Sequence, residues 1–284
     1  MNKILIQKSI QASLLADAYA LGAHWVYDEQ TLKDLPIDWN TLNDPQVLWH
    51  KGKKAGDYTH YGDHTLWLLE YIDRYNNFDI NTYAPFWYKK MQSYTGYIDG
   101  SSRETLKAMD ENMQTICGSN SQDLSICGRI MPLLLVSSDQ KDFLSKVDTF
   151  VQFTHNDTTV RETAGFLATI LYEIVDGHYF KDGLDKALQA FPDYVKVFSD
   201  AMRSVPEDSS QSIRTFGPAC GVKEGIRGAL HIMLKHQNFT QAMIANAKAG
   251  GDSAARGMVV GMIFGAMDKE LNTSWQTILN SIRD

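Results

Sequence analysis

Apolar residues recur every three or four positions through most of this 284-residue chain. Ile6, Ile10 and Leu14 show this spacing first, and further stripes follow within residues 106–116, 166–174, 222–233 and 275–282. Residues so spaced lie on one face of an α-helix, so each stripe predicts an amphipathic helix. Sustained period-two alternation, which marks strands, is absent, and the short apolar run 132–136 is ambiguous. The pattern predicts an all-α protein.

One stripe also carries glycine at every fourth position, at Gly257, Gly261 and Gly265. A glycine inside a helix costs about 0.5–1 kcal/mol relative to alanine, so three of them need a structural reason. A helix face without side chains lets another backbone pack closely against it. We therefore expect this helix to lie buried at the centre of the protein.

The chain shows no repeat of fixed period and no linker rich in glycine, serine or proline. Its length is at the upper end for one hydrophobic core, so we predict a single domain over residues 1–284. Polar stretches near 35–57, 118–125 and 205–221 predict loops. Because every apolar stripe could belong to the core, the sequence leaves the oligomeric state open.

Composition and charge exclude several classes of protein. Hydrophobic residues make up 44% of the chain and charged residues 21%, which is too apolar for a disordered protein. The net charge is −7 and no basic cluster stands out, so we expect no nucleic-acid partner. The longest apolar stretch, 257–267, is too short to cross a membrane.

The three cysteines, Cys117, Cys127 and Cys220, are few, odd in number and widely spaced. This usage fits reduced thiols better than a disulfide framework or a zinc site. The sequence also begins without the basic and apolar regions of a secretory signal. We therefore predict a cytoplasmic protein.

Three segments depart from ordinary helix chemistry. Asp17 lies inside the first apolar stripe, where a buried carboxylate needs a partner. Asp63 precedes a helical stripe, and Asp252 follows the pair Gly250–Gly251, so both acids are candidate N-caps. The double glycine also allows a positive φ or a close approach to a ligand. Each acid has a structural reading, and together they suggest carboxylates that converge on one site.

A histidine beside the second of these acids is harder to explain as a cap. His64 would sit near the positive end of a helix dipole, which disfavours a protonated imidazole. We therefore expect a neutral His64 that faces a ligand.

The three segments, with two others between them, resemble the ADP-ribosylglycohydrolase family in the same order along the chain. The matching segments are 16–18 (Ala-Asp-Ala), 62–65 (Gly-Asp-His-Thr), 128–132 (Gly-Arg-Ile-Met-Pro), 154–155 (Thr-His) and 250–255 (Gly-Gly-Asp-Ser-Ala-Ala). The resemblance runs through nearly the whole chain. It implies the fold of that family, a compact single-domain bundle of many helices.

The resemblance also implies a chemistry. In the family, acids and threonines hold two magnesium ions that grip a ribose diol and position water, and the N- or O-glycosidic bond of ADP-ribose is cleaved. The implied metal ligands are Asp63, Thr65 and Asp252, and no organic cofactor is implied. The implied substrate-binding residues are Arg129, His155, Gly250, Gly251, Ser253 and Arg256. Asp63 and Asp252 would also activate water, with acid–base help from His64, His24 or Asp17.

The sequence departs from the family pattern at several of these positions. His64 replaces the second acid of its motif, and Ala254 and Ala255 replace an acid and a threonine. Half of the implied ligand set is missing, which argues against a two-magnesium centre. The replacements resemble the branch that contains selenoprotein J and the jellyfish J-crystallins. In that branch Cys220 would lie near a selenocysteine or cysteine position, so its reactivity is a question to test.

Two functional hypotheses follow. The first is a hydrolase for ADP-ribose or a related ribosyl compound with a depleted metal site, whose partner is a small-molecule or ADP-ribosylated substrate. In this hypothesis, Arg256 and His64 fill the space of the two metal ions. The alternative is a catalytically silent ADP-ribose-binding or nucleotide-binding protein, or a structural protein of crystallin type.

Overall fold

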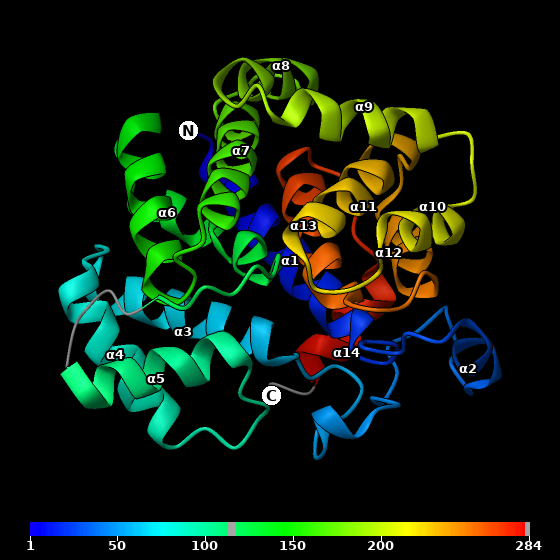
Figure 1. The fold of residues 1–284 in the computed structure, drawn as a ribbon, viewed down its shortest axis with the longest axis horizontal. Helices are drawn as coiled ribbons and strands as arrows, with labels where there is room; N and C mark the ends of the chain where they lie inside the picture. The colour runs from blue at the N-terminus through cyan, green and yellow to red at the C-terminus, as the bar shows by residue number, and fades with distance from the viewer. Residues whose placement is uncertain (113–117, 282–284) are drawn as a thin grey trace.

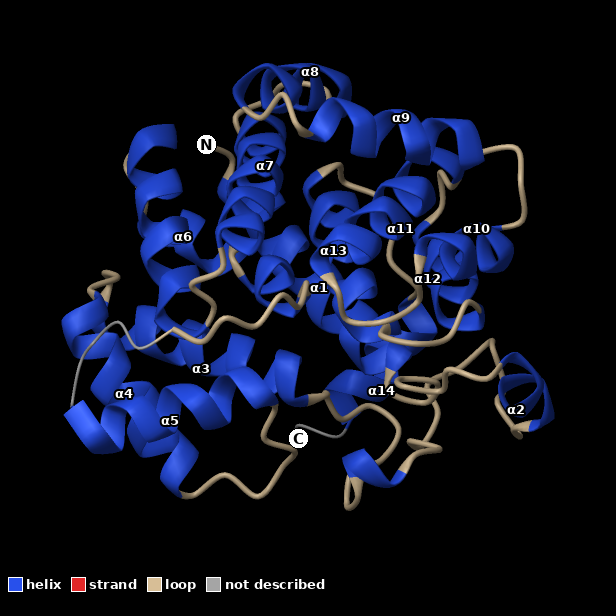
Figure 2. Cartoon of the chain, viewed as in Figure 1, coloured by secondary structure: helices blue, strands red, loops and turns tan. Residues whose placement is uncertain are grey.

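The computed structural model describes residues 1–112 and 118–281, and within them every regular element is a helix (Figure 2). The α-helices are α1 (Lys3–Ala20), α2 (Glu29–Asp34), α3 (His60–Tyr75), α4 (Ile80–Gln92), α5 (Gly100–Asn112), α6 (Gln140–Thr154), α7 (Thr158–Val175), α8 (Phe180–Ala190), α9 (Tyr194–Ser204), α10 (Ser209–Phe216), α11 (Val222–Lys235), α12 (Phe239–Lys248), α13 (Ser253–Ala266) and α14 (Thr273–Ser281). The short 3-10 helices are η1 (Leu48–His50), η2 (Ser125–Arg129) and η3 (Met131–Val136). The all-α prediction is confirmed. Met113, Ile116, Cys117 and Ile282 lie outside the described residues.

The glycine-bearing helix α13 lies at the centre of the fold, where all of its residues are buried (Figure 1). Its glycines face α1. A Cβ on Gly261 would lie 2.6 Å from the Ala12 carbonyl oxygen, and one on Gly265 would overlap the Lys8 carbonyl. The stripe therefore allows the close backbone contact that the sequence predicts.

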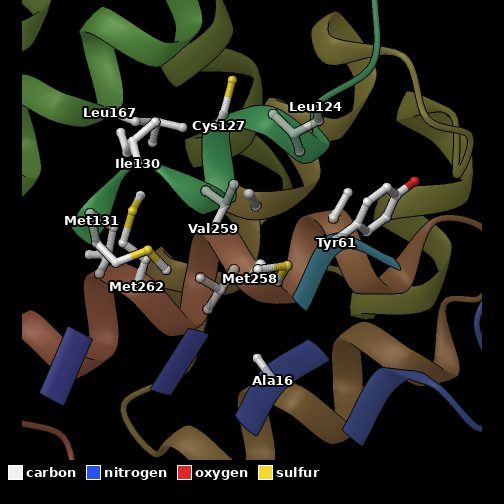
Figure 3. Close-up of a cluster of buried hydrophobic side chains, with 14 of the residues drawn as sticks. Ala16, Tyr61, Leu124, Cys127, Ile130, Met131, Leu167, Met258, Val259 and Met262 are labelled. Atoms are coloured by element: carbon white, nitrogen blue, oxygen red, sulfur yellow. The ribbon is translucent and has the colours of Figure 1, made fainter. Parts of the chain in front are cut away.

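Elsewhere α13 packs against η2 and α7. Figure 3 shows Met258 and Met262 of α13 among Cys127, Met131 and Leu167. Two hydroxyls of α1 complete the contact, because Ser9 donates to the Met262 carbonyl and Ser13 donates to the Gly128 carbonyl. These buried hydrogen bonds satisfy two carbonyls between the close-packed segments.

The remaining elements surround this centre. Figure 1 shows α3, α4 and α5 grouped at the lower left and α8 and α9 at the top. The ambiguous run 132–136 forms most of η3. The segment 205–221, which the sequence predicts as a loop, contains the helix α10. A side-chain cap begins this helix, because Asp208 accepts hydrogen bonds from the amides of Ser210 and Gln211. No helix in the described ranges is long and apolar enough to span a membrane.

The close α1–α13 contact gives a direct test. Replacing Gly261 by alanine should lower the free energy of unfolding by about 2–3 kcal/mol, because the added methyl group meets a backbone carbonyl that cannot move aside. The matched control is Gly100→Ala at the start of α5, where nothing lies within 4 Å of the added Cβ. Urea denaturation of both variants measures the difference, and equal stabilities would contradict the packing described here.

Candidate functional site

Asp252 lies at the N-terminus of α13, and its carboxylate has four partners. Its Oδ1 accepts hydrogen bonds from the Ala255 amide at 3.1 Å and from His24 Nε2 at 3.0 Å. Its Oδ2 accepts one from the Tyr61 hydroxyl at 3.2 Å, and the Cys220 thiol also donates to the carboxylate. Burial alone would raise the pKa of this carboxyl group, but the interaction with His24 and the hydrogen bonds from Ala255 and Cys220 together outweigh burial, and the pKa falls to about 2. Asp252 is therefore an ionised, fully hydrogen-bonded helix cap.

His24 connects this carboxylate to a histidine that the sequence did not single out. Its Nδ1 lies 2.8 Å from Nε2 of His50, which belongs to η1. Burial lowers the pKa of His24, and burial with the nearby His24 lowers the pKa of His50 to about 2. Both imidazoles are neutral at neutral pH. No motif identified His50, because it follows a polar loop without helical periodicity.

The double glycine before Asp252 takes the predicted positive φ, at 72° for Gly250 and 64° for Gly251. Gly251 exchanges backbone hydrogen bonds with the loop after α1: its amide donates to Val26 and its carbonyl accepts from Trp25, both at 2.8 Å. A Cβ on Gly251 would overlap the Pro218 carbonyl. The glycines therefore serve a contact between loops. The neighbouring Ser253 is buried, and its hydroxyl makes no hydrogen bond to any described residue.

Arg256 holds this loop in place. Its buried guanidinium donates to the carbonyls of Pro218 at 3.0 Å and Gly250 at 2.6 Å, and its Nε donates to the Asn246 side chain at 3.1 Å. No ion pair joins Arg256 to Asp252 within the described ranges. Arg256 lies four residues after Asp252 on the same helix, but its side chain reaches loop carbonyls instead.

Asp63 and Asp17 have different partners. Asp63 Oδ2 lies 2.6 Å from both the Lys53 ammonium nitrogen and the Tyr94 hydroxyl. Asp17 accepts hydrogen bonds from the amide and the hydroxyl of Thr59, at 2.8 and 2.5 Å. Burial raises the pKa of Asp17 to about 7, despite these hydrogen bonds. The buried acid thus has the partner that the sequence required.

These contacts do not fit the implied magnesium centre. Asp63 and Asp252 share no hydrogen-bond partner, and a lysine already neutralises Asp63. The Thr65 hydroxyl donates to the Tyr61 carbonyl of its own helix at 2.9 Å. In the described part of the chain, no three histidine, cysteine or acidic side chains are arranged to hold a metal ion. Magnesium prefers octahedral oxygen ligands that include free carboxylates, which these residues do not offer.

A second group of polar side chains lies beside Tyr61, and we call it the imidazole cluster. His60 and His64 come from the first turn of α3, Asp99 directly precedes α5, Arg129 ends η2 and His155 follows α6. All five are buried. Arg129 Nη1 lies 3.2 Å from His64 Nδ1, and its guanidinium carbon lies 5.8 Å from the centre of the Tyr61 ring. His60 Nε2 lies 3.4 Å from Asp99 Oδ2.

The charges of the cluster are set by burial and by close neighbours. Burial, with the nearby Arg129, holds the pKa of His64 well below its usual value, so the predicted neutral imidazole agrees with its surroundings. Burial would raise the pKa of Asp99, but contact with His60 holds it well below the ordinary value. Arg129 makes no ion pair with a carboxylate of the described residues, although Ser125 accepts a hydrogen bond from it at 3.3 Å.

Six buried polar atoms of the cluster make no hydrogen bond to any described residue. They are both ring nitrogens of His60, Nε2 of His64, Nε2 of His155, Nε of Arg129 and Oδ2 of Asp99. The nearest acid to His155 is Asp123, at 3.6 Å. The sequence predicts site roles for His64, Arg129 and His155, but it does not indicate His60 or Asp99. The only sequence feature that points to Asp99 is its position as a helix cap directly before α5.

Cys220 lies near Asp252 but is not an activated thiol. Burial and nearby acidic groups raise its pKa, so the thiol stays protonated at neutral pH. Its sulfur lies 3.8 Å from the Tyr27 hydroxyl. This environment gives no support to a reactive cysteine.

The family described as ADP-ribosylglycohydrolase matches residues 5–282, so the chain belongs to it. A solved structure titled "ADP-ribosylglycohydrolase-related protein complex" has the same fold, with a TM-score of 0.75 and 18% identity. That likeness covers 98% of this chain and 92% of the other.

Two relatives are named as crystallins. Crystallin J1A of Tripedalia cystophora is 25% identical over 281 residues, which cover 89% of this chain and 84% of the relative. Crystallin J1B of the same organism is 24% identical over 276 residues, with the same coverage. The chain is thus similar to members of the family that are named as crystallins.

The raised pKa of Asp17 predicts an unusual pH dependence of stability. Because the folded protein holds this proton up to about pH 7 and the unfolded chain releases it near 3.8, stability should fall as pH rises between these values. The contribution is about 4 kcal/mol as an order of magnitude. Asp17→Asn should flatten the profile, whereas Asp34→Asn, an exposed control on α2, should keep it. Urea denaturation from pH 4 to pH 8 measures both, and parallel profiles for the wild type and Asp17→Asn would contradict the assignment.

The neutralised carboxylates predict weak metal binding. Titration with millimolar Mg²⁺ or Mn²⁺ should give no saturable heat, because binding would have to displace Lys53 from Asp63 and His24 from Asp252. EDTA should leave the melting temperature unchanged. Stoichiometric, tight uptake of either ion in a calorimeter would refute this account of the site.

Proposed function

We propose that this chain binds the ribosyl part of ADP-ribose, or of a related compound, at the imidazole cluster without magnesium. The observation that carries the proposal is a set of three buried polar atoms without a hydrogen-bond or ion-pair partner among the described residues: His60 Nδ1, His64 Nε2 and Arg129 Nε. Each such atom costs about 1–3 kcal/mol if it is left unsatisfied. The total, about 3–9 kcal/mol, is a large part of the stability of a typical domain, so other polar groups must satisfy them.

The type of ligand follows from the atoms that face it. Arg129 Nε can only donate a hydrogen bond, and Nε2 of the neutral His64 also donates, because its Nδ1 already accepts from Arg129. The carboxylate of Asp99 can only accept. A simple anion would be repelled by the Asp99 carboxylate, and a simple cation by the Arg129 guanidinium. Neutral hydroxyl groups both donate and accept, so a sugar with several hydroxyls matches this set best.

Family membership supports ADP-ribose as the compound that presents such a sugar. It also supports a second candidate function, hydrolysis of the N- or O-glycosidic bond of ADP-ribose. The specific observation in its favour is the buried Asp17, whose pKa of about 7 suits a group that gives or takes a proton at neutral pH. The names of the two crystallin relatives support a third outcome, a structural role without a ligand.

Calorimetry with ADP-ribose in EDTA tests the proposal. The wild type should bind saturably, and Arg129→Met should weaken binding at least about tenfold, because it removes a buried hydrogen-bond donor. Arg161→Met is the matched control: Arg161 pairs with Asp148 away from the cluster, and its loss should leave affinity unchanged.

Two results would change the conclusion. If the folded wild type does not bind ADP-ribose, the proposal is wrong and the crystallin-type role is favoured. If binding occurs and ADP-ribose is also released from modified arginine or serine in EDTA, the protein is a hydrolase that works without magnesium. Release only after magnesium is added would contradict the metal-free site.

A further inference from the structure

A cavity of about 270 Å³ lies where α7, α9 and α11 meet, and none of its lining residues belongs to the sites described above. The helix α11 packs against both α7 and α9 (Figure 1). Pockets that bind small molecules usually measure about 300–1,000 Å³. This cavity is at the lower end of that range, so it suits a small metabolite rather than a nucleotide.

Charged side chains of both signs line the cavity. Its acidic side consists of Glu162 on α7 and Asp193, which directly precedes α9. Its basic side consists of Lys223 and Arg227, which are four residues apart and so share one face of α11. Among the described residues, no ion pair joins the acidic side to the basic side, and Arg227 pairs instead with Asp200. Charges of opposite sign therefore face one cavity without neutralising each other.

A buried hydroxyl group adds to the acidic side. Tyr194 and Thr163 share a hydrogen bond of 2.6 Å between their hydroxyls, and both hydroxyls also donate to the Thr159 carbonyl, at 3.4 and 2.8 Å. Both hydroxyl hydrogens are thus directed at protein oxygens, and the Tyr194 oxygen keeps a lone pair that can accept a further hydrogen bond. Two carboxylates and this oxygen together offer acceptors to an ammonium group, which carries three donors.

The basic side has more positive charge than the acids around it neutralise. The Asp200 carboxylate, which pairs with Arg227 at 3.3 Å, also pairs with Lys196 and Arg203. One negative charge is therefore shared by three cations. Lys223 adds another cation and forms no ion pair within the described ranges. A carboxylate in the cavity would gain charge-assisted hydrogen bonds from this side.

The same arrangement excludes ligands with only one charge. A simple anion would be repelled by the acidic side, and a simple cation by the basic side. A zwitterion presents the complementary charge to each. Val197 of α9 and Ile226 of α11 also line the cavity, so they offer an apolar contact to an aliphatic group of similar size.

We propose that this cavity binds a free aliphatic α-amino acid. The ammonium group binds the acidic side and the Tyr194 oxygen, the carboxylate binds the basic side, and the aliphatic side chain contacts Val197 and Ile226. This site is separate from the imidazole cluster, and it does not depend on the function proposed there.

Titration calorimetry of the full-length chain with L-leucine and three analogues tests the proposal. Isoamylamine lacks the carboxylate of leucine, isocaproate lacks the ammonium group, and glycine lacks the aliphatic side chain. L-leucine should bind saturably at millimolar concentrations. Each analogue should bind about tenfold more weakly, because it loses the contacts of one side of the cavity.

Substitutions on the two sides locate the binding. Lys223→Met and Glu162→Gln should each weaken L-leucine binding about threefold to tenfold, because each removes an exposed charge that faces one end of the ligand. Lys33→Met on α2 is the matched control, since Lys33 is also exposed and pairs with Glu29. It should leave the affinity unchanged, and the melting temperature checks that all three variants fold.

Three results would overturn the proposal. The first is the absence of saturable L-leucine binding to the folded wild type. The second is an equal affinity for L-leucine and either isoamylamine or isocaproate, which would mark a site for a single charge. The third is L-leucine binding that neither Lys223→Met nor Glu162→Gln weakens, which would place the ligand elsewhere on the chain.

Discussion

The close contact between α13 and α1 is the constraint on which the site depends. Glycines at every fourth position bring the backbone of α13 against carbonyls of α1, and no larger residue fits there. This contact places the N-terminus of α13, with Asp252, beside the loop that leaves α1 and carries His24. The partners of the carboxylate are therefore determined by the packing of two central helices, whose interior position makes any change costly.

Charge neutralisation inside the protein distinguishes this site from the metal centre that the family pattern implies. Each of the three acids has a protein group that would compete with a metal ion: Lys53 at Asp63, His24 at Asp252 and Thr59 at Asp17. Buried carboxylates need such compensation, and a resident cation or hydrogen-bond donor supplies it permanently. In this chain, protein groups therefore compensate the three acids.

The imidazole cluster illustrates the opposite condition. Its buried atoms are only partly satisfied by protein groups, which is unfavourable for a purely structural core. By contrast, both ring nitrogens of His231 are paired, one with Ser204 and the other with Ser209, and Nε2 of His236 also bonds to Ser209. The same residue type therefore has two roles in this chain, and the difference lies in which ring nitrogens find protein partners.

The sequence by itself determined the helical class, the buried glycine helix and the helix cap at Asp252, because these depend on local spacing and local hydrogen bonds. The predicted cap at Asp63 is wrong: Thr59 caps α3, which begins at His60, and Asp63 lies inside its first turn. The sequence also indicated the family, through ordered motifs. Only the tertiary structure revealed the partners of the acids: Lys53 lies in a loop, His50 ends a short 3-10 helix, and Asp252 meets His24 across 228 residues. Helical spacing places Arg256 on the same helix as Asp252, but it does not predict the loop carbonyls that this side chain reaches. Long-range polar contacts depend on the three-dimensional positions of residues that are distant in the sequence. Local sequence patterns therefore do not predict these contacts.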